Sequence, residues 1–153
     1  MKKKITFLIV LTAMVPVAVF SQQAWMSLMP SVVSRVIDGD TLELVGGERV
    51  RLIGVDAPEL NQPGGREASA FVRELVEGRM VWLEPDGANR DRFGRLRRYV
   101  WLRNPSNTYD ASQIRRYQLN ALLIEHGHAR VMIVGRVRND ALFRQLAAER
   151  GRN

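Results

Sequence analysis

Residues 32–55 read VVSRVIDGDTLELVGGERVRLIGV, and this stretch decides the fold class. It holds three short runs rich in β-branched and apolar residues, and apolar residues alternate with arginines in the third run. Turn-forming sequences separate the runs, because Asp and Gly favour tight turns. The pattern predicts three consecutive strands, over residues 32–37, 41–45 and 49–55, joined by turns at Asp38-Gly39-Asp40 and Gly46-Gly47.

After the third run the apolar period changes from two to that of a helix. Apolar residues at helical spacing predict a helix from Glu67 to Val76 that ends at Gly78. Further along, the sequence predicts a short strand over 81–83, a loop over 85–89 and a strand over 96–102. A connector over 104–118 is left unassigned. A second helix is predicted over 119–126, capped by Gly127, and a third starts near Asn139 or Asp140. The order predicts an α+β fold, predominantly β: a five-stranded OB-fold-like barrel with about three packed helices.

Composition limits the classes of function. The chain has 153 residues, the size of one domain, and no cysteine, so it has neither disulfides nor a thiol nucleophile. Its three lysines stand together at positions 2–4, and the other 20 of its 23 basic residues are arginines, against 16 acidic residues. Guanidinium groups match phosphate oxygens two at a time, so the composition favours an anionic partner such as nucleic acid.

The first 25 residues are typical of a targeting segment. Lys2, Lys3 and Lys4 precede a mostly apolar run over residues 5–20, the pattern of an export signal. The alternative is an uncleaved membrane anchor, and either reading places the remaining domain, over 30–153, outside the cytoplasm: secreted, periplasmic or attached to the membrane.

Two stretches carry carboxylates suited to a hard cation. Asp40 and Thr41 follow the first turn, and Asp56, Ala57, Pro58 and Glu59 follow Arg51 at the end of the third strand. Pro58 cannot donate to a strand ladder and keeps Ala57 extended, which leaves the Ala57 carbonyl free to bind a cation. Asp56 and that carbonyl can complete a site begun by Asp40, while Glu59 addresses a water. For the first stretch the alternative is an ordinary β-turn, and for the second it is a charged strand end at the surface. The predicted strand would place Arg51 and Asp56 at opposite ends of one edge.

A third stretch, Asp91-Arg92-Phe93-Gly94-Arg95, predicts a sharp turn before a strand. The glycine allows the turn and can direct Arg95 back across the sheet, but taken alone the stretch favours the alternative of a basic, solvated hairpin. His126 and His128 flank a helix end and are interpreted as capping residues near the surface.

Taken in order, these stretches resemble the thermonuclease family, typified by staphylococcal nuclease. The matching blocks are IDGDT, RLIGVDAPE, REASAF, DRFGR and ALLIEHGHARV, which lie between Val33 and Val134. The resemblance implies a barrel with three helices that hydrolyses DNA and RNA with one Ca²⁺ ion.

The resemblance also implies residue roles. Asp40, Asp56 and the Ala57 carbonyl correspond to calcium ligands, and Thr41 and Asp38 to supporting residues near the metal. Glu59 corresponds to the general base or water-orienting group, and Arg51 and Arg95 to the arginines that hold the scissile phosphate. Arg92 and Phe93 are expected to contact substrate. Tyrosines of the type enzyme's nucleotide pocket are replaced here by Phe93, Ile133 and Gly135, so base preference does not carry over.

The sequence therefore predicts an exported calcium-dependent nuclease acting by metal-assisted water attack. Two alternatives come from other classes: a catalytically inactive nucleic-acid-binding module and a membrane-anchored interaction domain. Nothing in the pattern indicates an obligate protein partner.

Overall fold

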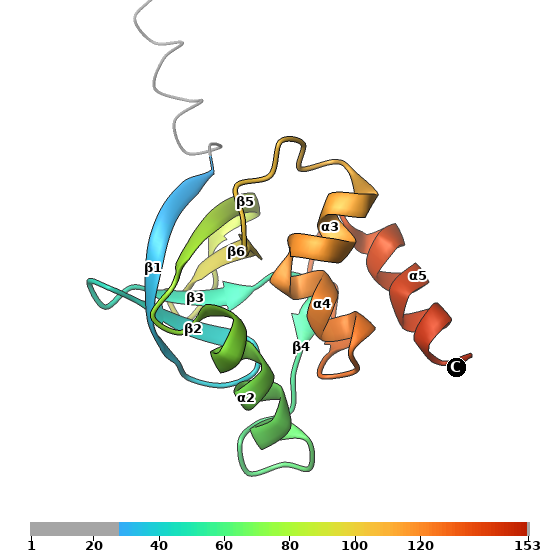
Figure 1. Ribbon diagram of the computed structural model, residues 1–153, viewed down its shortest axis with the longest axis horizontal. Helices are drawn as coiled ribbons and strands as arrows, with labels where there is room; N and C mark the ends of the chain where they lie inside the picture. The colour runs from blue at the N-terminus through green and yellow to red at the C-terminus, as the bar shows by residue number, and fades with distance from the viewer. Residues whose placement is uncertain (1–27, 153) are drawn as a thin grey trace, which may run out of the picture.

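A closed five-stranded barrel forms the centre of the protein, as predicted (Figure 1). The computed structural model describes residues 28–152, so the predicted targeting segment lies outside the described residues. The barrel order is β1-β2-β3-β6-β5, in which every neighbouring pair is antiparallel except β3 and β6. The strands are β1 (Met29–Val36), β2 (Thr41–Leu44), β3 (Arg49–Leu52), β5 (Met80–Arg90) and β6 (Leu96–Trp101), and a separate two-stranded sheet joins β4 (Val55–Asp56) to β7 (Arg130–Val131).

Four helices pack outside the barrel. Their bounds are α2 (Gly65–Val76), α3 (Ala111–Tyr117), α4 (Leu119–Glu125) and α5 (Asp140–Arg150). Figure 1 shows α3, α4 and α5 grouped together, with α2 below the barrel. Their buried apolar residues join those of the strands in one core, where Trp101, Tyr99 and Phe143 are the largest side chains. Within residues 28–152, no helix is long and apolar enough to cross a membrane.

The structure corrects three element predictions. The expected loop over 85–89 is part of β5, which continues past Pro85 because β5 pairs with β6 on both sides of an irregular register there. The third strand is not continuous to Val55: it stops at Leu52, and Gly54, with φ 78°, turns the chain into β4. The unassigned connector contains α3, whose N-cap Asp110 accepts a hydrogen bond from the Ser112 amide at 2.8 Å.

Candidate active site

The turn between β1 and β2 places Asp40 at the edge of the barrel. The Asp38 carboxylate accepts a hydrogen bond from the Asp40 amide at 2.9 Å, which shapes the turn. A Cβ atom on Gly39 would collide with the side chains of Ala57 and Ala68, so a glycine is needed for the turn to pack against the chain after β4. The Ala57 amide then donates to Asp40 Oδ2 at 2.9 Å, and Thr41 Oγ1 donates to Asp40 Oδ1 at 3.1 Å.

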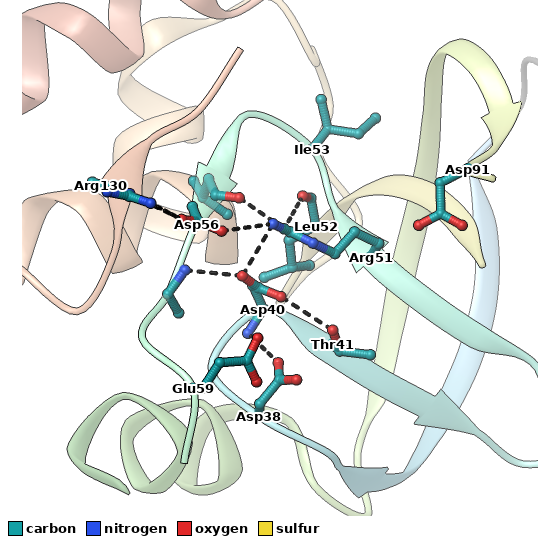
Figure 2. Close-up of polar contacts among 12 residues, drawn as sticks. Asp38, Asp40, Thr41, Arg51, Leu52, Ile53, Asp56, Glu59, Asp91 and Arg130 are labelled. Carbon is teal, nitrogen blue, oxygen red and sulfur yellow. Dashed lines mark hydrogen bonds and ion pairs between the residues drawn. The ribbon is translucent and has the colours of Figure 1, made fainter. Parts of the chain in front are cut away.

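Arg51 is the centre of the site. Its Nη2 lies 3.2 Å from Asp40 Oδ2 and 3.3 Å from Asp56 Oδ1, so one guanidinium nitrogen joins the two carboxylates predicted as metal ligands (Figure 2). Its Nη1 donates to the carbonyls of Leu52 and Val55, at 2.8 and 2.7 Å. The guanidinium is therefore fixed by backbone on one side and by carboxylates on the other.

This geometry corrects the expectation that Arg51 and Asp56 stand at opposite ends of an edge. The turn at Gly54 reverses the direction of the chain and returns Asp56 to the side chain of Arg51, only five residues earlier. A side chain at position 54 would also meet the ring of Phe143 from α5, so the turn requires glycine for its conformation and for space.

The donor set fits a hard cation. Burial raises the pKa of Asp40 to about 6, although Arg51 and the Ala57 amide act in the opposite direction, so the buried charge of Asp40 is incompletely compensated. Asp40 and Asp56 offer only oxygen atoms, which Ca²⁺ prefers. No cluster of three or more metal-binding His, Cys, Asp or Glu side chains occurs among residues 28–152, so further ligands must be carbonyl, substrate or water oxygens.

Glu59 follows the two carboxylates on an exposed, tightly turned segment. Its amide donates to the Gln62 side chain at 3.1 Å, and its carbonyl accepts from the Gln62 amide at 2.8 Å. In Figure 2, Glu59 and Asp38 lie on one side of Asp40, while Arg51 and Asp56 lie on the other. Within the described part of the chain, the Glu59 carboxylate forms no ion pair and accepts no hydrogen bond, so its oxygens remain available to a ligand or a water.

Arg95 approaches the site from the hairpin between β5 and β6, as the glycine before it predicts. Gly94 has φ 82°, and Arg95 Nη1 donates to Thr41 Oγ1 at 3.3 Å across 54 residues of sequence. Arg95 therefore contacts Thr41, whose hydroxyl donates to Asp40, while Arg51 contacts Asp40 and Asp56 directly. One guanidinium group thus joins the two carboxylates, and the second reaches the hydroxyl beside them.

A cavity of about 420 Å³ opens beside these arginines. Its walls include Arg51 and Arg95, together with Arg92 and Phe93, the two residues predicted to contact substrate. The Phe93 ring is 68% exposed, with the Arg92 and Arg95 guanidinium carbons 4.7 and 5.4 Å from its centroid. An exposed ring beside cations suits a stacked base next to a phosphate.

Sequence reasoning missed two residues of the site. Asp91 holds Arg95 in place, accepting from its Nε at 2.7 Å and its amide at 3.0 Å; the four-residue spacing inside the DRFGR turn was the available signal. Arg130 on β7 lies 2.7 Å from Asp56 Oδ2, and Figure 2 shows it reaching Asp56 from the side opposite Arg51. No local signal marks Arg130, because 74 residues separate it from Asp56.

His126 and His128 lie outside this arrangement. His126 is the C-cap residue of α4, and both imidazoles stack on Phe71 of α2, with ring centroids 5.0 and 4.5 Å apart. These contacts fix the turn after α4 against α2.

Comparisons with known proteins agree with this geometry. A family model described as "Staphylococcal nuclease homologue" matches residues 49–150, more than half of the chain. The "Thermonuclease" of Staphylococcus intermedius is 46% identical over 79 residues, which cover 46% of this chain and 47% of that protein. "Protein ParB" of Escherichia coli is 35% identical over 67% of this chain and 58% of its own length, and the "Micrococcal nuclease" of Shigella flexneri is 30% identical over 74% and 63%. The chain spans about half the length of the first of these relatives.

Proposed function

Because this chain belongs to the family of staphylococcal nuclease homologues, we propose that it is a nuclease, and more narrowly an exported, calcium-dependent one that hydrolyses phosphodiester bonds of DNA and RNA. The observation that carries the proposal is that Arg51, which pairs with Asp40, and Arg95, which contacts the neighbouring Thr41 hydroxyl, line the same cavity. Phosphodiester hydrolysis builds negative charge on the non-bridging oxygens, and fixed guanidinium donors stabilise that charge.

The arginines contribute by being held in place before substrate binds. Asp91 occupies Arg95 Nε and Thr41 contacts Nη1, which leaves the remaining donors of the guanidinium for a phosphate oxygen. Because these groups are already oriented, little reorganisation is needed during the reaction.

Asp40 and Asp56 would hold the cation, with the Ala57 carbonyl as a third oxygen ligand and Thr41 as a support for Asp40. When bound, calcium supplies positive charge at the phosphate and a site for the attacking water. Glu59 would accept a proton from an attacking water or orient that water, a role that suits an exposed carboxylate without an ion-pair partner among the described residues.

Export rests on the lysine cluster at positions 2–4 and the apolar run over 5–20. A cleaved leader would give a free domain, and a retained leader would give a membrane-attached one. Immunoblotting of cell fractions distinguishes the two by mass and by location.

The test is cleavage of labelled duplex DNA and of RNA by the full chain, with calcium and with excess chelator. We expect cleavage of both polymers with calcium and none with chelator. Nucleic-acid binding without cleavage under any metal condition would instead identify a binding module that has lost catalysis.

A further inference from the structure

We propose that a second pocket, beside the candidate active site, binds a phosphate of the same nucleic-acid strand that occupies that site; this inference rests on the proposed nuclease function. The α5 pocket, as we name it, lies between the segment after β4, the turn from α4 to β7, and α5, and has a volume of about 620 Å³. Volumes of about 300–1,000 Å³ are usual for ligand sites.

The α5 pocket is continuous with the candidate metal site. Asp56, Ala57 and Pro58 line the pocket, and the first two are predicted cation ligands. A strand with one phosphate at that site therefore has a direct path into the pocket. The lining also includes His128, Arg130 and Arg150, contributed by the α4–β7 turn, β7 and α5.

The charge of the lining favours an anion. The charged residues of the lining are Arg130, Arg150 and one acidic residue, Asp56, which leaves a net positive charge. Both oxygens of Asp56 are already paired, one with Arg51 and the other with Arg130. Arg150 forms no ion pair within the part of the chain that the structure describes, so its charge remains available for a ligand.

The α4–β7 turn leaves room for the Arg150 guanidinium beside the pocket. Gly127 has φ 78°, and a Cβ atom on it would collide with the Arg150 guanidinium, so the guanidinium lies directly against the glycine. Stacking of His126 and His128 on Phe71 fixes the same turn from the other side. Arg150 is exposed, so its guanidinium is accessible to an anion from solvent.

His128 adds a hydrogen-bonding group without adding charge. Burial, together with the neighbouring His126 and Arg150, lowers the pKa of His128. The imidazole is therefore neutral at pH 7 and carries one N–H donor. A lining of guanidinium, imidazole and amide groups matches the oxygens of a phosphodiester.

The test compares two lengths of labelled single-stranded DNA, a dinucleotide and a decamer, because only the longer strand reaches both sites. Binding is measured by fluorescence anisotropy in chelator, where no metal-dependent cleavage disturbs the titration. We expect Arg150→Gln to weaken decamer binding about 5- to 10-fold and dinucleotide binding less than 2-fold. The slope of log affinity against log salt concentration for the decamer should fall by about the amount that corresponds to one phosphate contact. Arg150→Lys, which keeps the charge, should recover part of the loss.

Arg144→Gln is the matched control. Arg144 lies on the same helix, pairs with Asp140 at 2.5 Å and does not line the α5 pocket. Its substitution should change decamer binding less than 2-fold. Three results would each overturn the proposed subsite. The two substitutions could have equal effects, Arg150→Gln could weaken dinucleotide and decamer binding equally, or the wild type could bind the decamer no more tightly than the dinucleotide. Cleavage is not needed for this result, so an inactive wild type with a length-specific Arg150 effect refutes the nuclease proposal and leaves the subsite standing.

Discussion

Replacing Asp40 with asparagine should stabilise the metal-free protein while removing its calcium response. Burial raises the pKa of Asp40 from 3.8 to about 6, so the ionised carboxylate is less favourable in the folded than in the unfolded chain. One pKa unit corresponds to 1.36 kcal/mol, so the penalty at pH 7 is about 3 kcal/mol. Asparagine has the shape of the protonated acid, and Asp40→Asn should therefore raise the free energy of unfolding by about 2–3 kcal/mol.

The sign of the pH dependence follows from the raised pKa. As the pH falls from about 6 towards 3.8, the folded wild type takes up a proton that the unfolded chain does not, and the wild type gains stability relative to Asp40→Asn. The advantage of the variant should therefore be full at pH 7 and above and absent below pH 3.8. Urea unfolding followed by tryptophan fluorescence in chelator, at pH 8, 7, 5 and 4, measures it.

Calcium should offset most of the stability advantage of the variant. A ligand at about 100 times its dissociation constant stabilises the folded state by about 2.7 kcal/mol, and Asp40→Asn should lose most of this gain. Asp91→Asn is the matched control: burial acts to raise the pKa of Asp91, but hydrogen bonds from Arg95 and Phe93 outweigh it and lower that pKa. Asp91→Asn should therefore destabilise the protein above pH 4, and the difference should fade as the pH falls further. A metal-free Asp40→Asn less stable than wild type at pH 7, or a gap independent of pH, would refute the reasoning.

Three further predictions concern catalysis and metal binding. Arg51→Lys and Arg95→Lys should each lower the cleavage rate at least ~100-fold in single-turnover assays, because lysine keeps the charge but not the two-pronged geometry of the guanidinium. Arg51→Lys should also lower the melting temperature. The control Arg73→Lys should change neither the cleavage rate nor the melting temperature. Glu59→Gln should lower turnover ~100-fold and keep nucleic-acid affinity within a few-fold, and equal turnover would remove Glu59 from the mechanism. Arg130→Ala should tighten calcium binding up to ~5-fold in calorimetry, because its exposed ion pair with a metal-binding carboxylate is worth at most ~1 kcal/mol; weaker binding would show that Arg130 supports the metal site.

Local signals predicted the barrel strands and most of the helices. Asp-Gly-Asp and Gly-Gly turns between β-branched runs specify hairpins through neighbouring residues alone, and β1, β2 and β3 form there. Helix α3 was missed because only Ile114 is buried in it, so no apolar period marks it. The loop predicted at Pro85 followed from the residue's poor strand propensity, which pairing with β6 overrides.

Long-range geometry could not be predicted from the sequence. The parallel pairing of β3 with β6 joins strands more than 40 residues apart, and no local pattern specifies it. The contact of Arg51 with Asp56 depends on the left-handed conformation of Gly54, and that of Arg130 with Asp56 on the pairing of β4 with β7. The site was therefore predictable as a set of residues but not as a set of contacts.

The two arginines of the site differ in how many of their N–H donors are already bonded within the protein. Arg51 uses Nη1 for two carbonyls and Nη2 for the carboxylates of Asp40 and Asp56, so most of its donors are already engaged within the protein. Arg95 is oriented by Asp91 through Nε and touches Thr41 weakly at 3.3 Å, so more of its donors remain for a ligand. Loss of Arg51 should therefore affect the fold and cation affinity as well as rate, whereas loss of Arg95 should act mainly on rate. Two residues that sequence alone treats as a symmetric pair thus become distinguishable once their carbonyl and carboxylate partners are known.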